Sequence, residues 1–156
     1  MYARRASLRD LCLLRRWRNE ELVRRWSGTT QPIGPVEHCR WFLTSMGDDS
    51  SEILIILNQA GCRVGTVQFR CERVRSWTVS ITIDPKRRNE GLGTLALSVG
   101  EDWLVREKAP YELRAMIHPE NQASRRLFVR RGFAELGLND SGFALYVKSV
   151  SGNRPI

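Results

Sequence analysis

Residues 88–94 have the sequence Arg88-Asn89-Glu90-Gly91-Leu92-Gly93-Thr94, and they lie between an alternating apolar segment and a long helix-forming segment. Two glycines one residue apart allow the backbone to approach a ligand with its N–H groups turned outward. The first turn of the following helix leaves N–H groups unpaired and carries partial positive charge. Lys86, Arg87 and Arg88 add full positive charges beside it. The stretch therefore predicts an anion site, most often for phosphate, and a flexible turn without a ligand is the alternative.

The segments around this stretch predict a mixed β-sheet with helices. Residues 77–83 alternate between two faces, with Trp77, Val79, Ile81 and Ile83 on one and Thr78, Ser80 and Thr82 on the other. Further strands are expected at residues 52–57, 63–72, 113–117, 133–138 and 143–150, and helices at residues 8–26, 36–46, 91–108 and 121–131. The order of these elements predicts a single α/β domain over residues 1–150, followed by a flexible tail at residues 151–156.

The composition is that of a basic chain without a membrane segment. Of the 156 residues, 25 are basic and 17 are acidic, which gives a net charge of +8. A basic surface favours an anionic partner, such as nucleic acid, acidic lipid or a phosphorylated small molecule. No apolar run approaches the ~18 residues of a membrane span. The four cysteines form no C-x-x-C pair, so we expect reduced thiols, a cytoplasmic protein and no metal site.

Two motifs resemble those of a known family. Arg88-x-x-Gly91-x-Gly93, placed after a strand, is similar to the acetyl-CoA-binding signature of the GNAT N-acetyltransferases. The family's second cofactor motif is similar to Asn121-x-x-Ser124-x-x-x-Phe128-x-x-x-Gly132-Phe133. The resemblance covers residues 52–150. It implies a single-domain α/β GNAT fold with a mixed central sheet of about six to seven strands and about four helices, splayed between the strands at residues 77–83 and 113–117.

The resemblance implies acetyl-CoA as the cofactor and coenzyme A as the product. The pyrophosphate would lie on residues 87–94, and the pantetheine arm would pair with the backbone of Ile81 and Ile83 and contact Asn121. An arginine of the later helix would reach the 3′-phosphate, although a solvated helix face is the alternative for each of these arginines. The cofactor-binding residues implied in this way are Ile81, Ile83, Arg87, Arg88, Asn89, Gly91, Leu92, Gly93, Thr94, Asn121, Ser124 and Arg126.

Acetyl transfer to an amine requires a neutral amine, a stabilised oxyanion and a thiolate that can leave. A backbone N–H near Ile81 is the candidate oxyanion donor. The family's usual acid is a tyrosine at the position of Phe128, which cannot donate a proton. The acid is therefore missing, replaced or unnecessary, since a thiol pKa near 8.5 makes a thiolate a tolerable leaving group. The alternative that the chain is a degraded, non-catalytic member of the family also stays open.

Several other residues are candidates for the proton transfers. As acid we consider Ser80 and His118, and as base Glu37, His38, His118 and Glu120. His118 is a candidate base because histidine side chains in general exchange protons near neutral pH, whereas a structural hydrogen bond beside Pro119 is its alternative role. Ser80 belongs to a polar face on a central strand, and we expect this face to line the acceptor cleft.

The N-terminal helices are expected to select the amine. Their pattern resembles the GNAT branch that acetylates the 4-amino group of UDP-linked amino-dideoxy sugars. Ribosomal-protein N-terminal acetyltransferases share part of it, and aminoglycoside acetyltransferases are more loosely similar. The acceptor-binding residues implied by this resemblance are Trp17, Arg18, Asn19, Arg24, His38 and Trp41. Packing in the core is the alternative role for the tryptophans.

We therefore expect an acetyl-CoA-dependent N-acetyltransferase that works by direct attack in a ternary complex. The expected acceptor is a primary amine on a small molecule, a nucleotide-linked amino sugar. A protein N-terminal acetyltransferase is one alternative. A non-catalytic CoA-binding or basic nucleic-acid-binding module is another, although no helix-turn-helix, RRM or zinc signature supports nucleic acid. We expect a monomer or homodimer without a nucleic-acid or membrane partner.

Overall fold

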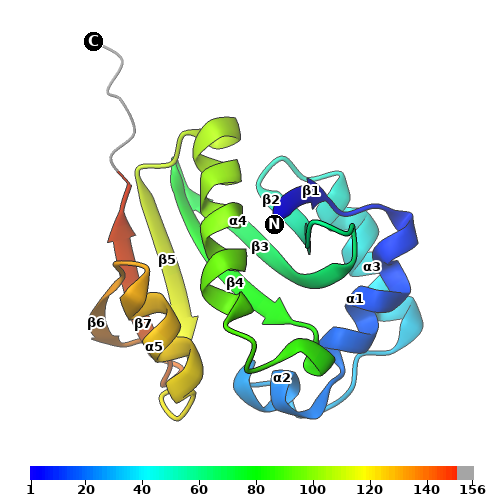
Figure 1. The fold of residues 1–156 in the computed structure, drawn as a ribbon. Helices are drawn as coiled ribbons and strands as arrows, with labels where there is room; N and C mark the ends of the chain where they lie inside the picture. Colours follow the sequence, from blue (N-terminus) through cyan, green and yellow to red (C-terminus); the bar gives the residue numbers. More distant parts are fainter. Residues whose placement is uncertain (151–156) are drawn as a thin grey trace.

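The structure, a computed structural model that describes residues 1–150, contains a seven-stranded mixed sheet with helices on both faces (Figure 1). The sheet order is β1-β2-β3-β4-β5-β7-β6. The strands are β1 (Tyr2–Arg5), β2 (Ser51–Leu57), β3 (Arg63–Arg73), β4 (Ser76–Ile83), β5 (Glu112–Ile117), β6 (Ala134–Leu138) and β7 (Ala144–Ser149). The α-helices are α1 (Leu11–Arg18), α2 (Glu21–Trp26), α3 (Pro35–Met46), α4 (Leu92–Lys108) and α5 (Gln122–Arg130), with 3₁₀ turns η1 (Leu8–Asp10) and η2 (Pro85–Arg87). The predicted tail at residues 151–156 lies outside the described residues.

The parallel pair β4–β5 forms the centre of the sheet. All other neighbouring strands are antiparallel. Residues Ser76–Thr78 of β4 lie beside Glu112–Arg114 of β5, and the pairing ends there. The two strands diverge toward their C-terminal ends, which confirms the predicted splay. Parallel neighbours need a crossover connection, and α4 supplies it.

Two hydrophobic cores lie on opposite faces of the sheet. Successive residues of a strand point to opposite faces. In β2, Leu54 and Ile56 belong to the core that contains α4 and α5, whereas Ile53, Ile55 and Leu57 pack with α1 and α3. All strand residues of this second core come from β2. The helices α1 and α3 therefore cover the β2 part of their face, and the same face is open over the central strands.

The first strand is absent from the sequence-based prediction. β1 pairs with β2 in antiparallel register, from Tyr2 beside Leu57 to Arg5 beside Leu54. Its two arginines gave the segment a polar character, but both are neutralised locally. Arg4 forms an ion pair with Asp10 at 2.7 Å, and Arg5 donates two hydrogen bonds to Glu52. These pairs allow a basic segment to serve as an edge strand.

The predicted helix over residues 8–26 is divided into η1, α1 and α2, which gives five α-helices in place of about four. The break occurs at Asn19 and Glu20. Glu20 has an extended backbone and caps α2, because its side chain accepts a hydrogen bond from the backbone N–H of Val23. Within residues 1–150, no helix is both long enough and apolar enough to cross a membrane.

Asp10 links three parts of the chain beneath α1. Its carboxylate is fully buried and accepts hydrogen bonds from Arg4 and Ser7 and, at 2.9 Å, from Arg63 of β3. Burial raises the pKa of this carboxyl, but the hydrogen bonds from Arg4 and Ser7 outweigh it and lower the pKa to about 2. Asp10 therefore remains charged and connects β1, η1 and β3.

Candidate active site

The turn after β4 carries a row of unpaired backbone N–H groups. Asn89 and Gly91 have φ angles of 64° and 71°, whereas Arg88 is extended. Left-handed residues within such a turn direct successive N–H groups to one side, which creates an anion-binding concavity. Within residues 1–150, no backbone N–H of residues 88–94 donates a hydrogen bond to a carbonyl or a side chain. These free donors at the N-terminus of α4 fit the diphosphate of acetyl-CoA.

Carboxylates hold the two arginines of this turn. Arg87 Nε lies 2.9 Å from Glu90 Oε2, and Arg88 Nη2 donates to Glu20 Oε2 at 2.7 Å. The hydrogen bond from Arg88 is the main cause of a lowered pKa at the Glu20 carboxyl. Both arginines therefore lie at the anion site with their charge partly neutralised by a carboxylate. The backbone N–H groups of the turn are the donors that are available to an anion.

Glycine is favoured at the two positions of the turn for different structural reasons. At Gly91 a Cβ atom would meet nothing within 4 Å, so glycine is favoured there by the positive φ alone. At Gly93 a Cβ atom would lie 2.5 Å from Leu127 Cδ1 of α5. Gly93 therefore allows α4 and α5 to pack closely, which is a reason for this glycine apart from the predicted cofactor contact.

The N-terminus of α5 carries the predicted pantetheine contacts. The Asn121 side chain accepts a hydrogen bond from the backbone N–H of Ser124 at 3.1 Å and so caps the helix. Its Oδ1 is engaged in this cap, which leaves its amide NH₂ as the group available to a ligand. Arg126 is exposed, whereas the preceding Arg125 is tied to Tyr146 and Glu135. Of these two arginines, only Arg126 is free to reach an outside phosphate.

Phe128, at the family's usual acid position, is a core residue. Its ring packs edge-on against Phe133, with centroids 4.9 Å apart. The nearby phenol of Tyr146 donates to Glu135 at 2.6 Å and accepts from Arg125 at 2.9 Å. Burial, followed by the hydrogen bond to Glu135, raises the pKa of Tyr146. Tyr146 is therefore engaged elsewhere and does not replace the missing tyrosine.

The polar face of β4 opens onto the uncovered side of the sheet. Ser80 is exposed and lies beside Gln68 of β3. Ile81 and Ile83 pair with β3 on one side only, because the pairing with β5 ends at Thr78. The backbone edge at Ile81 and Ile83 therefore faces the gap between the diverging strands, where the resemblance expects the pantetheine arm.

His118 lies where segments from both ends of the chain meet across this gap. Its ring contacts Trp26 of α2 and Phe143, with centroid distances of 5.2 and 5.7 Å. Its Nδ1 accepts a hydrogen bond from the backbone N–H of Glu120 at 3.2 Å. A neutral ring with this bond carries its proton on Nε2. His118 therefore makes the structural bond that was considered as its alternative role, and in this tautomer its Nε2 is a hydrogen-bond donor.

The contact between α2 and the loop after β5 escaped the sequence analysis. Gly28, just beyond α2, faces the Phe143 ring, and Arg25 lies 3.8 Å from Glu120. Phe143 was assigned only to a strand, and Trp26 only to a helix. Contacts between loops distant in sequence leave no periodic pattern, so local patterns gave no signal for this group.

Three predicted acceptor residues are structural instead. Trp17 is 1% exposed and belongs to the core beneath α1. His38 is 2% exposed and its Nε2 bonds to the carbonyl of Leu11 at 3.1 Å, while burial lowers its pKa. The Asn19 side chain donates to the Ile33 carbonyl and accepts from the Ile33 N–H. These side chains hold α1, α3 and the intervening loop together, while Trp17 Nε1 and His38 Nδ1 are buried without a hydrogen-bond partner among residues 1–150.

The remaining predicted acceptor and base residues are more exposed. Arg24 donates to the carbonyls of Asn19 and Thr30, so it too is a structural residue. Arg18 donates to Ser27 Oγ at 2.8 Å, and Trp41 is 39% exposed. Glu37 is in the first turn of α3, which packs against α1 and β2, two strands away from β4. The base role of Glu37 stays a prediction.

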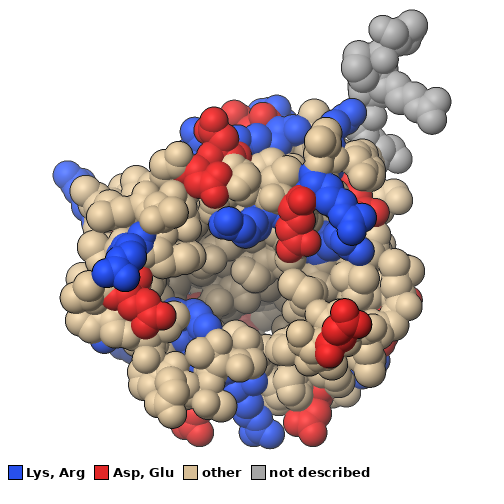
Figure 2. All heavy atoms as spheres, turned by 180° about the vertical axis from the view of Figure 1, so that it is seen from behind, with Lys and Arg blue, Asp and Glu red and all other residues tan. Residues whose placement is uncertain are grey.

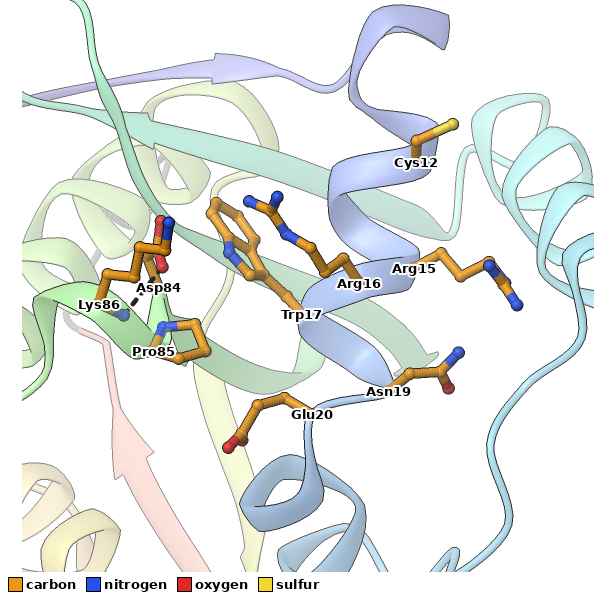
Figure 3. Close-up of a pocket in the computed structure, with 9 residues that line it drawn as sticks. All are labelled: Cys12, Arg15, Arg16, Trp17, Asn19, Glu20, Asp84, Pro85 and Lys86. Atoms are coloured by element: carbon orange, nitrogen blue, oxygen red, sulfur yellow. Dashed lines mark hydrogen bonds between the residues drawn. The ribbon is translucent and has the colours of Figure 1, made fainter.

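A cleft of about 700 Å³ lies between α1 and the segment that follows β4 (Figure 3). Its lining is Cys12, Arg15, Arg16, Trp17, Asn19, Glu20, Asp84, Pro85 and Lys86. In Figure 3 the Trp17 side chain extends from α1 toward Asp84 and Pro85. The lining contains both basic and acidic side chains, so its charge favours no single ligand class. It borders the phosphate turn through Glu20, the partner of Arg88.

Comparisons with solved structures agree with this architecture. A domain from Methanocaldococcus jannaschii is 22% identical with a TM-score of 0.82, covering 95% of this chain and 97% of that chain. A spermidine N-acetyltransferase from Vibrio cholerae, solved with CoA and spermine, is 15% identical with a TM-score of 0.81, covering 93% and 91%. An aminoglycoside acetyltransferase in complex with coenzyme A is 19% identical with a TM-score of 0.80, covering 95% and 94%.

No curated protein matches the chain. A family model, described as an acetyltransferase (GNAT) domain, matches residues 2–134, which is most of the chain. The sheet with its splayed central pair and the turn with free N–H groups are the features that this assignment requires. The chain therefore belongs to the GNAT acetyltransferase family, and it is an acetyl-CoA-dependent N-acetyltransferase.

Proposed function

We propose that the enzyme acetylates the primary amine of a nucleotide-linked amino sugar. The single observation that carries acetyl transfer is the turn at residues 88–94, whose N–H groups have no partner within the described chain and lie beside the diverging ends of β4 and β5. The net charge of +8 supports an acceptor that bears phosphate and disfavours a polycation. The N-terminal pattern around Arg18 supports an amino-sugar nucleotide by resemblance.

Bound acetyl-CoA supplies the activated acetyl thioester. The N–H groups of residues 88–94 bind its diphosphate, and the amide of Asn121 and the free edge of β4 orient the arm. The backbone N–H of Ile81 is our candidate donor to the oxyanion. These donors are held rigidly by the sheet and helix, so they need no reorganisation when charge develops.

We assign His118 to the stabilisation of the leaving thiolate. Its Nδ1 accepts from the Glu120 N–H, so its Nε2–H is a donor that can hydrogen-bond the thiolate without giving up the proton. Ser80, exposed on β4, is the second candidate donor. Deprotonation of the amine is left to water that reaches the open face of the sheet. This assignment explains how an enzyme with Phe128 can work without the usual tyrosine.

A thiol-release assay tests the proposal. The purified protein is mixed with acetyl-CoA and, separately, with a UDP-linked 4-amino-4,6-dideoxy sugar, N-terminal peptides and aminoglycosides. We expect coenzyme A release above the amine-free rate with the nucleotide sugar. Release with peptides alone would indicate a protein N-terminal acetyltransferase. Binding of acetyl-CoA without release from any amine would indicate a non-catalytic CoA-binding module.

A glycine pair provides the control for cofactor placement. Gly91→Glu places a charged side chain at a left-handed position in the phosphate turn, and we expect it to abolish measurable acetyl-CoA binding. Gly137→Glu makes the same change at φ 130° in β6, three strands away from β4. It should bind acetyl-CoA as the unmodified protein does. Equal binding by both variants would show that the diphosphate lies elsewhere.

We also infer that residues 1–150 act as one domain in the cytoplasm. The four cysteines are free thiols, which supports a reducing compartment. A monomer or homodimer is expected. Size-exclusion chromatography with light scattering measures the oligomeric state directly.

A further inference from the structure

Two arginines lie in one row across the centre of the sheet. Arg70 of β3 is in register with Thr78 of β4, and Thr78 is in register with Arg114 of β5. Residues in register on neighbouring strands point to the same face. The neighbours Phe69, Val79 and Leu113 belong to the buried core on the α4 side. Arg70, Thr78 and Arg114 therefore project from the opposite, open face.

The donors of these two arginines are largely unused. Arg70 Nη2 lies 3.7 Å from Asp48, and Arg114 Nε lies 3.5 Å from Glu112. Both distances exceed that of a good hydrogen bond. Within residues 1–150, Arg114 Nε is buried without a hydrogen-bond partner. By contrast, Arg4 holds its carboxylate at 2.7 Å. The pair thus keeps free guanidinium N–H groups that a stronger anion can occupy.

The two carboxylates near these arginines, Asp48 and Glu112, leave one direction from which an anion can approach. Asp48 precedes β2, on the side of β3 away from β4, and it accepts from the N–H and hydroxyl of Ser50. Glu112 is at the start of β5, on the side away from the splay, and it accepts from Ser76 Oγ at 2.8 Å. Each acid is fixed by its own hydrogen bonds. The approach from the splay, over Thr78, is not blocked by either.

This row is close to the place where acetyl transfer would occur. Ser80 is two residues beyond Thr78 toward the splay, so the two rows are about 7 Å apart at ~3.3 Å per residue. Figure 2 shows the face behind the sheet, which has a hollow with a mostly uncharged rim and both basic and acidic side chains near it. An acceptor in this hollow would have its amine near Ser80 and another part of the molecule over Thr78.

We propose that Arg70 and Arg114 form an anion subsite that holds a phosphate or carboxylate group of the acceptor, about 7 Å from the reacting amine. The inference rests on the proposed acetyltransferase function and adds the position and chemistry of acceptor recognition. Arginine suits this task because its planar guanidinium binds such groups through two parallel hydrogen bonds. The two arginines flank Thr78 on neighbouring strands, so both can hydrogen-bond to one anion bound above Thr78.

Calorimetry on the enzyme saturated with coenzyme A tests the subsite, because the phosphate turn is then filled. Uridine diphosphate and succinate serve as the diphosphate and carboxylate probes. The variants are Arg70→Gln and Arg114→Gln, and the control is Arg106→Gln on α4, an exposed arginine paired with Glu107. We expect the Kd of the bound probe to rise at least about tenfold in both variants and to stay unchanged in the control. Arg114→Lys should retain part of the affinity.

The two probes identify the source of the anion. Tighter binding of uridine diphosphate indicates a phosphorylated acceptor, and tighter binding of succinate indicates an acceptor carboxylate. The inference is overturned if neither probe binds the unmodified enzyme, or if Arg70→Gln and Arg114→Gln bind as the control does. Failure of coenzyme A itself to bind would instead remove the proposed function. In that case the difference between each subsite variant and the control still reports on the subsite, since a probe bound at the phosphate turn would be affected equally in all three.

Discussion

Arg88 of the phosphate turn and Glu20 at the start of α2 form an ion pair with an N–O distance of 2.7 Å. Glu20 also caps α2 through the Val23 N–H. A single carboxylate therefore joins the cofactor turn to the helix that contacts His118 through Trp26. The state of the turn and the position of α2 are physically linked by this pair.

The change Glu20→Gln should tighten acetyl-CoA binding. Glu20 competes with the diphosphate for Arg88 and repels it, so its neutralisation should lower the Kd about threefold, as expected for a partly exposed pair. Calorimetric titration measures the effect. Glu21→Gln, an exposed acid one residue along, serves as the control and should leave the Kd unchanged. A weaker affinity in Glu20→Gln would mean that the pair orders the turn for binding rather than competing with it.

The same pair predicts a pH dependence of stability. Arg88 lowers the pKa of Glu20 below its ordinary value of 4.5, so the pair stabilises the folded state above that pH. The stabilisation should disappear as the pH falls through the lowered pKa and Glu20 becomes protonated. Urea unfolding of the unmodified protein and Glu20→Gln should therefore differ at pH 7 and converge under acid. A difference that persists at pH 2 would assign the effect to the helix cap alone.

Asp10 should give a larger effect in the same direction. Its pKa of about 2, against an ordinary value of 3.8, corresponds to about 2.5 kcal/mol of stability that is present above pH 4 and lost as the pH falls through 2. Asp10→Asn leaves Arg4 and Arg63 without their buried partner, and it should cost about 3–5 kcal/mol at pH 7. Urea unfolding from pH 7 to pH 2 measures both. Asp140→Asn, at an exposed turn, should cost less than about 0.5 kcal/mol.

Gly93 and Leu127 should be energetically coupled. Gly93→Ala places a Cβ atom against Leu127 Cδ1 and should destabilise the fold by about 1–3 kcal/mol. In Gly93→Ala with Leu127→Ala, the clash is removed, so the combined loss should be smaller than the sum of the single losses. Urea unfolding provides the double-mutant cycle. Gly91→Ala with Leu127→Ala should be additive, because a Cβ at Gly91 meets nothing within 4 Å. Additivity in both cycles would contradict the packing role of Gly93.

Phe128→Tyr tests whether an acid is missing. With a thiol pKa near 8.5 the sulfur can leave as a thiolate without being protonated, so we expect kcat to change less than about threefold. The added hydroxyl enters a site that is buried against Phe133, and the melting temperature should fall. Steady-state kinetics and thermal unfolding give the two readouts. A kcat at least about thirtyfold higher would show that the natural chain lacks its acid.

The sequence predicted what depends on local pattern. The glycines at Gly91 and Gly93, the alternation in β4 and the Asn121 cap each appear within a short window, and together they led to the splayed sheet. β1 was missed because Arg4 and Arg5 look polar until the distant acids Asp10 and Glu52 are placed beside them.

The acceptor residues are hard to predict from the sequence for a related reason. Trp17, Asn19 and His38 are polar or aromatic residues of the kind that bind ligands. Here Trp17 packs in the core, Asn19 hydrogen-bonds to Ile33 and His38 hydrogen-bonds to Leu11. Arg70 and Arg114 were not singled out, since nothing in the chain order brings them together. Only strand register shows that they share a row.

The early end of the β4–β5 pairing also bears on solubility. A strand with unpaired N–H and carbonyl groups can recruit a strand from another molecule and start aggregation. Here the unpaired edges face each other across an internal gap, while the outer borders of the sheet are the short strands β1 and β6. The unpaired edges are thus inside the sheet and not at its outer border. The central gap in the sheet therefore adds no long unpaired strand edge at the outside of the molecule.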